Sequence, residues 1–194
     1  MYSYMGFLMP PALDLRPWGL HPLLETNVRA LDAQFPDTLT VISGARDLRR
    51  QCHAMAANIA IDRDWLIQTY TRKDRPSGPL AQLCQGAINA QPDVVSIQGL
   101  ADILLATLAA APLGSMISWH TFELLGKAAS LAVDFQATEA LVNTVTTKPT
   151  ELGEQIRKFA ATLPHYDAFL FKESGLARLH YQIFPVTLRP VQAV

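Results

Sequence analysis

The sequence has few cysteines, and their spacing excludes two common kinds of site. Cys52 and Cys84 are the only two, with 31 residues between them and no Cys-x-x-Cys pair. A scaffold built on disulfides and a structural zinc site built on thiolates both need more cysteines, or more closely spaced ones. We therefore interpret both residues as ordinary buried thiols.

An excess of basic charge is also missing. The chain has 16 lysines and arginines against 17 acidic residues, a net charge of −1 and a pI near 6.5. Proteins that bind nucleic acid or a charged membrane surface usually concentrate positive charge. We therefore expect neither kind of partner, and a small molecule or a neutral polymer fits the composition better.

Long hydrophobic runs are absent from the sequence as well. The longest, residues 103–113, is too short to cross a bilayer, which takes about 20 apolar residues. The apolar N-terminus, residues 1–11, lacks the basic region and the apolar core of a secretion signal. We expect a soluble chain made in the cytoplasm without a signal peptide, so that another route must deliver it if it acts elsewhere.

What the sequence does contain is a folded domain of mixed secondary structure. It has 194 residues, of which 49% are hydrophobic and 17% charged, enough for one domain with a real core. Apolar residues at intervals of three and four predict helices, and alternating β-branched segments predict strands. Because the strands are few and do not alternate regularly with the helices, the expected class is α+β. The expected helices are 21–35, 46–61, 62–70, 80–90, 96–111 and 150–162, and the expected strands are 38–43, 168–172 and 179–186.

The segment 118–135 combines an imidazole and a carboxylate in apolar surroundings. His120 follows a serine and a tryptophan, and Asp134 lies inside the strand-like run Leu-Ala-Val-Asp-Phe. A buried carboxylate is costly unless it is paired, and a metal ion is one such partner. Two simpler interpretations remain open: His120 is a half-buried histidine, and Asp134 caps a helix that begins at Gln136. Glu123, three residues after His120, is a weaker candidate ligand than Asp134.

A second pair of candidate residues lies near the C-terminus. His180 occurs in an alternating apolar strand, and Glu173 ends the strand before it, so a tight turn would bring the two close. With His120 and Asp134, His180 would complete three protein ligands of a catalytic zinc site and leave a fourth position for water. Glu173 would take a proton from that water, and Arg46 would stabilise the oxyanion or hold a substrate carboxylate. Singly, each of these residues also fits an ordinary strand, turn or surface role.

Three motifs, the second of which is split into two halves, follow one another along the chain in the order found in one family of zinc peptidases, which they resemble. Residues 43–46 read Ser-Gly-Ala-Arg after a strand, with Gln51 in the next helix; residues 118–122 read Ser-Trp-His-Thr-Phe, and residues 131–135 read Leu-Ala-Val-Asp-Phe. Glu173-Ser174 followed by His180 completes the series. Over residues 38–186 the chain resembles the D-alanyl-D-alanine dipeptidases and carboxypeptidases and the phage L-alanyl-D-glutamate endopeptidases, relatives of lysostaphin-type peptidases and the hedgehog domain.

The spacing of the motifs differs from the family in three places, and the first is the interval from Glu173 to His180, which is one residue longer than in the hedgehog form. Thirteen residues separate His120 from Asp134, more than in the family, so that residues 123–130 look partly inserted. A further 66 residues separate Gln51 from Ser118, which indicates a helical insertion over about 62–117 that would cover or reshape the cleft.

The resemblance implies a fold and a function. We expect a single peptidase-like domain over 1–194, with an N-terminal arm over 1–18 and a small antiparallel sheet that carries the metal site between helices. The implied protein is an endolysin-like zinc metallopeptidase that binds Zn²⁺, cuts an amide in the peptide stem of peptidoglycan, and reaches the cell wall by phage- or secretion-type delivery. Ser118 and Gln51 would contact the substrate. The alternatives are a non-catalytic binding or scaffold protein that keeps this fold, and a helical interaction protein that docks through residues 96–111.

Overall fold

A computed structural model of the chain describes residues 13–71, 78–111, 118–121, 123–124, 127–173 and 176–184. Within these ranges only the backbone is described for Trp119, Glu123, Leu124, Lys127, Ala128 and Glu173. The helices are α1 (Pro22–Gln34), α2 (Leu48–Ile61), α3 (Trp65–Tyr70), α4 (Gly78–Asn89), α5 (Ile97–Ala109) and α6 (Glu151–Ala160), with 3-10 turns η1 (Arg16–Trp18) and η2 (Trp119–Thr121). The strands are β1 (Val41–Ser43), β2 (Glu123–Leu124), β3 (Lys127–Ala128), β4 (Ala132–Phe135), β5 (Tyr166–Glu173) and β6 (Leu176–Ile183).

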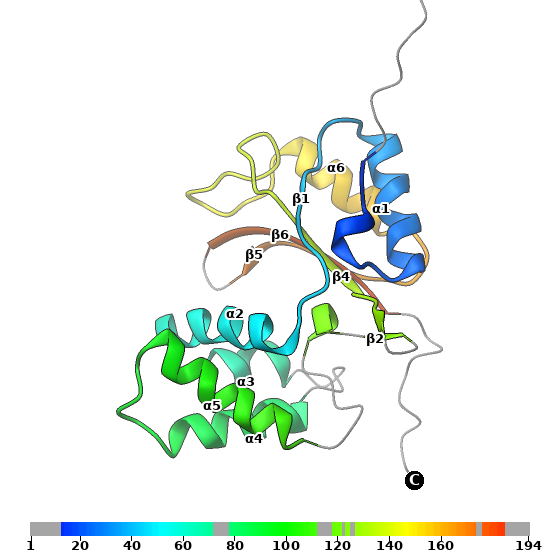
Figure 1. Cartoon of the computed structure of the whole chain (residues 1–194). Coiled ribbons are helices and arrows are strands. Elements are labelled where there is room, and N and C mark those ends of the chain that lie inside the picture. The colour runs from blue at the N-terminus through cyan, green and yellow to red at the C-terminus, as the bar shows by residue number, and fades with distance from the viewer. Residues whose placement is uncertain are drawn as a thin grey trace, which may run out of the picture.

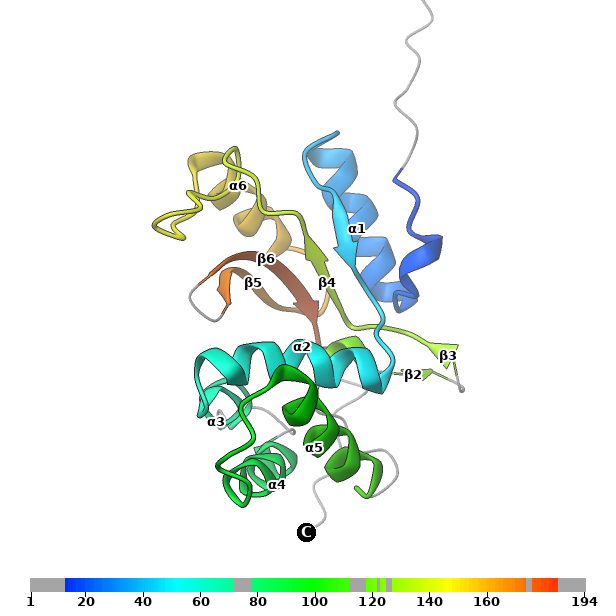
Figure 2. The same cartoon turned by 60° about the vertical axis from the view of Figure 1, so that its left-hand side comes forward.

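The expected α+β class is confirmed. Four antiparallel strands form one small sheet in the order β1-β4-β6-β5, and β2 and β3 pair separately as a hairpin. Figure 1 and Figure 2 show helices on both sides of the sheet, with α1 and α6 on one side and the layer α2–α5 on the other.

The first core fills the space between the sheet and the helices α1 and α6. Leu24, Val28 and Leu31 recur at intervals of three and four on α1, so all three point to the same side and are fully buried. They pack with alternate residues of β6, among them Leu179 and Tyr181. Since side chains alternate across a strand, the residues between these must face the opposite side of the sheet.

A second core lies inside the helical layer α2–α5. Met55 and Ile59 of α2 pack there with Leu104 of α5, together with both cysteines. Cys52 and Cys84 are fully buried, and burial raises the pKa of Cys52 to about 11 and that of Cys84 to about 12. The interpretation of both as buried free thiols is confirmed.

The helical layer includes more of the chain than the expected insertion. Helices α3, α4 and α5 lie within 62–117, and they share one apolar core with α2, which precedes that range. Residues 72–77 and 112–117 of the expected insertion lie outside the described residues, as do residues 1–12 of the expected arm. Residues 16–18 of that arm form η1.

Helix ends follow capping side chains more closely than they follow the apolar pattern. The expected helix 46–61 begins at Leu48 because the carboxylate of Asp47 accepts a hydrogen bond from the backbone of Arg50. Thr150 and Ser96 cap α6 and α5 in the same way. The alternative in which Asp134 caps a helix from Gln136 is wrong, since residues 136–149 contain no helix.

None of the helices in the described ranges is both long enough and apolar enough to span a membrane.

Candidate metal centre

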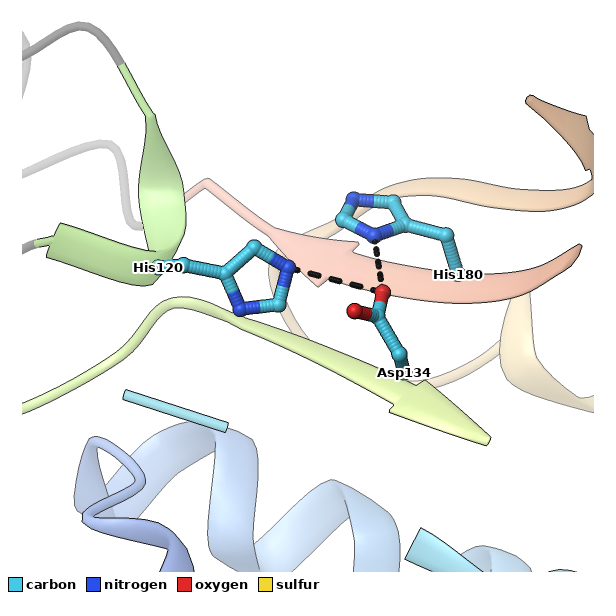
Figure 3. A group of neighbouring side chains, drawn as sticks. All are labelled: His120, Asp134 and His180. Atoms are coloured by element: carbon cyan, nitrogen blue, oxygen red, sulfur yellow. Dashed lines mark hydrogen bonds and ion pairs between the residues drawn. The ribbon is translucent and has the colours of Figure 1, made fainter. Parts of the chain in front are cut away.

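Three side chains from distant parts of the chain converge on the sheet face that looks toward the helical layer. His120 comes from η2, Asp134 from β4 and His180 from β6 (Figure 3). Asp134 Oδ1 lies 2.7 Å from His180 Nδ1 and 3.4 Å from His120 Nε2. One ligand atom from each residue can be chosen so that all three lie within 4.8 Å of one another, an arrangement that can hold a metal ion.

Strand pairing brings the carboxylate and the second imidazole together. Asp134 and His180 are direct partners in the antiparallel pair β4–β6, so their side chains leave the sheet on the same face and side by side. The side chain of His120 reaches Asp134 and His180 because a backbone hydrogen bond holds its residue beside the segment that follows β1. The backbone carbonyl of His120 accepts this bond, of 2.9 Å, from the backbone N–H of Arg46.

The long spacing between His120 and Asp134 is taken up by the hairpin β2–β3. This hairpin lies within residues 123–130, the part that looks inserted in the sequence. It begins after η2 and ends before β4, so that the extra residues lengthen the connection between the two halves of the motif. The split motif therefore still brings its histidine and its aspartate together.

The ring of His120 is oriented by a backbone carbonyl. Its Nδ1 lies 2.7 Å from the carbonyl oxygen of Gly44, and because that oxygen only accepts, Nδ1 carries the proton. The unprotonated Nε2 therefore faces Asp134, as a metal-ligating nitrogen should. A side chain at Gly44 would have its Cβ 2.2 Å from the carbonyl oxygen of Trp18, so only glycine permits this approach.

The ring of His180 is oriented by a chain of two further side chains. The amide nitrogen of Gln182 donates to a carboxylate oxygen of Asp167, which fixes the direction of the amide because the carboxylate only accepts. Gln182 Oε1 then lies 2.8 Å from His180 Nε2 and accepts its proton. The lone pair of His180 is left on Nδ1, which faces Asp134.

The donor set fits a divalent cation. Two imidazole lone pairs and a carboxylate oxygen would repel one another at these distances unless a cation or shared protons lay between them. A tetrahedral zinc ion with bonds of about 2.1 Å keeps its donors about 3.4 Å apart. The separation of 3.4 Å between Asp134 Oδ1 and His120 Nε2 matches that value, and the separation of 2.7 Å between Asp134 Oδ1 and His180 Nδ1 is shorter, so a small movement of side chains opens the site to an ion.

The protonation states at neutral pH also suit metal binding. Burial lowers the pKa of His120, although contact with Asp134 works in the other direction, so the neutral ring is favoured. Burial raises the pKa of Asp134, but in the metal-free site its contacts with His120 and His180 outweigh this and hold the pKa well below the usual range, because protons shared with the facing ring nitrogens then take the place of the cation. The carboxylate therefore stays charged.

Arg46 lies beside the cluster, and its guanidinium is already engaged. It donates to Asp134 Oδ2 at 2.5 Å, to Ser43 Oγ at 2.9 Å and to Gln51 Oε1 at 3.4 Å. This cation balances the charge of Asp134 and holds the carboxylate in place. Its role as an oxyanion stabiliser stays a prediction.

The two expected substrate contacts are buried at the edge of the cluster. Gln51 on α2 is 3% exposed and accepts from Arg46, and Ser118 is 7% exposed. The hydroxyl of Ser118 accepts from the backbone of His120, and its carbonyl accepts from the hydroxyl of Thr121. Both residues line the cleft described below. Ser118 holds the backbone of the candidate ligand His120, and Gln51 holds Arg46, which balances the charge of Asp134.

The expected general base, Glu173, is described only by its backbone. It pairs with Leu176 at the end of the β5–β6 hairpin, whereas the partner of His180 is Leu170. Leu176 lies four residues before His180 on β6, about 13 Å along the strand. The expectation that a tight turn brings Glu173 close to His180 is therefore wrong for the backbone, because the partner of Glu173 is four residues away from His180. The side chain of Glu173 lies outside the described residues, and its role as the base stays a prediction.

A cleft of about 660 Å³ opens onto the cluster. One wall is the sheet face, with Leu170 and Lys172 of β5 and Arg178 of β6. The other wall is formed by α2 and α3, including Trp65 and Tyr70. The helical layer thus forms one of the two walls of the cleft.

Gln182, Asp167 and the carbonyl of Gly44 are parts of the site that the sequence did not indicate. Gln182 is 2% exposed, and its position two residues after His180 places it on the same face of β6. That alternation was readable in the sequence, but the pairing with Asp167 depends on the β5–β6 register. A backbone carbonyl leaves no signal in a sequence at all.

Comparisons with models of known families, with curated proteins and with solved structures find no match to this chain. The features of this chain that bear on its function are the cluster, the cleft and the order of the motifs.

Replacing Gln182 by methionine is expected to weaken metal binding 10- to 100-fold, because the acceptor that fixes the tautomer of His180 is lost. Competition with a chromophoric chelator measures the affinity, and ¹⁵N NMR of the ring reports the tautomer. Gln68→Met, on the helical wall of the same cleft, is the matched control and should change the affinity less than about twofold. Equal affinities in the two variants would contradict the orienting role of Gln182.

Proposed function

We propose that the protein is a zinc-dependent peptidase that hydrolyses an amide bond in the peptide stem of peptidoglycan, of the D,D-carboxypeptidase or L-alanyl-D-glutamate endopeptidase type. The observation that carries the proposal is the convergence of His120, Asp134 and His180, with a ring nitrogen of each histidine turned toward the carboxylate. Two nitrogens and one oxygen form a ligand set typical of catalytic zinc, which leaves a position open.

The remaining groups of the site have roles that suit this chemistry. A zinc ion in such a site lowers the pKa of water and polarises a carbonyl. Arg46 keeps Asp134 charged and in place, while Gly44 and Gln182 present the lone pairs of the two rings. Glu173 is proposed to accept a proton from the attacking water and to pass it to the nitrogen of the leaving amine, which departs neutral as the C–N bond breaks.

The substrate class is supported by the order of the motifs and by the shape of the site. Residues 43–46, 118–135 and 173–180 follow the order seen in peptidases that act on cell-wall peptides. The cleft of about 660 Å³ lies within the size range of sites that take a short peptide or a similar ligand. Action on the cell wall would require delivery by a phage or a secretion system, which is part of the proposal.

The test is metal analysis combined with digestion of purified peptidoglycan. We expect about one zinc per chain, and cleavage that disappears with a chelator and returns when zinc is added. Mass spectrometry of the products identifies the bond, since a carboxypeptidase releases alanine and an endopeptidase exposes a new glutamyl amine. A chain that binds no divalent metal and cleaves nothing contradicts the proposal and favours the non-catalytic scaffold.

A further inference from the structure

Two basic side chains on the sheet wall of the cleft have no acidic partner in the described part of the chain. Lys172 of β5 and Arg178 of β6 both line the cleft, and both are exposed. No hydrogen bond or ion pair joins either of them to another described side chain. Charged side chains without a partner, inside a cleft rather than on a convex surface, are candidates for ligand recognition.

Strand register places these two cations close together and near the metal cluster. Arg178 lies two residues from His180 on the same face of β6, about 7 Å along the strand. Lys172 pairs with Ala177, the residue next to Arg178. A register shift between Leu170 and Lys172 produces this pairing. Because Lys172 and Arg178 both line the cleft, and the shift brings Lys172 level with the residue beside Arg178, the two cations lie near each other on the cleft side of the hairpin, on the side of His180 away from Gln182.

The other charges of the cleft do not neutralise this pair. The third cation, Arg46, is held by Asp134, Ser43 and Gln51. One acid outside the metal cluster lines the described cleft, Asp62, which lies on the opposite, helical wall. The sheet wall is thus positive next to the candidate metal ligands.

We infer that Lys172 and Arg178 form a carboxylate-binding subsite that selects acidic peptides. The inference rests on the proposed function in one respect, which is that the ligand is a peptide. An extended peptide advances about 3.5 Å per residue, so a carboxylate held by these two long side chains belongs to one of the two residues next to the bond at the metal. An arginine and a lysine together offer a forked donor and a flexible point charge to one carboxylate.

Binding of two peptides to metal-stripped protein tests the subsite. The peptides are L-alanyl-D-glutamyl peptides that are identical except that the free glutamyl carboxylate of one is a primary amide in the other. Metal-stripped protein prevents cleavage, so the measurement is independent of peptidase activity. By calorimetry, we expect wild type to bind the free acid about tenfold more tightly than the amide, as two charge-assisted hydrogen bonds allow.

The double variant Lys172→Gln/Arg178→Gln should bind both peptides equally. Both positions are exposed, so the substitutions should leave the fold intact, and circular dichroism checks this. The control Arg50→Gln/Lys158→Gln also removes one arginine and one lysine, but from exposed sites outside the cleft. It should keep the tenfold preference. The inference is overturned if wild type does not discriminate, if neither peptide binds at millimolar concentration, or if the double variant retains the preference. If zinc-loaded wild type does not cleave peptidoglycan but metal-stripped wild type still prefers the free acid, the proposed function is contradicted and the carboxylate-binding subsite is not.

Discussion

Replacing Asp134 by asparagine is expected to abolish zinc binding at physiological metal concentrations. Asp134 is the only carboxylate of the cluster, and its Oδ1 is the atom that both histidines approach. An amide oxygen is a neutral and weaker ligand. If one of three protein ligands supplies about a third of a binding free energy of 10–16 kcal/mol, its loss lowers affinity on the order of a thousandfold.

The same substitution should also destabilise the metal-free protein. Arg46 donates to Asp134 at 2.5 Å, and the two side chains are only 19% and 12% exposed. Loss of the negative charge leaves this cation with neutral acceptors, at a cost of about 2 kcal/mol. Zinc content by mass spectrometry and unfolding by urea measure the two effects. Asp93→Asn, at an exposed position without a described partner, is the control and should change neither.

The destabilisation should depend on pH in a defined direction. Burial raises the pKa of Asp134, but contacts with His120 and His180 bring it well below its usual range. A carboxylate whose pKa is lower in the folded state stabilises that state above its unfolded pKa of about 3.9, and the stabilisation is lost as the pH falls toward the folded value. The stability difference between wild type and Asp134→Asn should therefore be full at pH 6 and shrink below about pH 4.

Retention of one zinc per chain by Asp134→Asn would contradict the assignment of Asp134 as a ligand. A stability difference that persists unchanged at acid pH would show that the substitution acts through packing rather than through the charge.

The helices could be predicted from the sequence because their signals are local. Helix α6 has Thr150 as its cap, acidic residues in the first turn and basic ones in the last, and its bounds differ from the expected 150–162 by two residues or fewer. The strand β6 was harder to bound, since it begins at Leu176 rather than at 179. Its first residues lie at the exposed end of a hairpin, where burial gives no alternating pattern.

The candidate site was readable only in part, because its geometry depends on long-range pairing. The residue types of His120, Asp134 and His180 gave the chemistry, but nothing local indicates that Asp134 lies opposite His180 in the sheet. Arg46 appeared free to bind substrate, whereas the fold turns it onto Asp134. The position of Glu173 depends on a shift in strand register that no sequence pattern indicates.

Replacing Glu173 by glutamine is expected to lower kcat for peptide hydrolysis by about 10²- to 10⁴-fold while zinc content stays at one per chain. The amide keeps the size of the side chain but does not accept a proton from water. Because Glu173 is not expected to be a ligand, metal binding and activity should separate in this variant, which distinguishes it from Asp134→Asn.

Asp62→Asn is the decisive comparison for Glu173. Asp62 is the described acid that lines the cleft outside the metal cluster, and it lies on the helical wall, opposite the sheet. If Glu173 is the base, Asp62→Asn should keep kcat within about threefold of wild type, as expected for an exposed residue outside the reaction. If instead Asp62→Asn loses activity and Glu173→Gln retains it, the base comes from the end of α2. The helical layer would then supply the catalytic base. Glu173 would then not correspond to the acid that precedes the histidine in the peptidase motif.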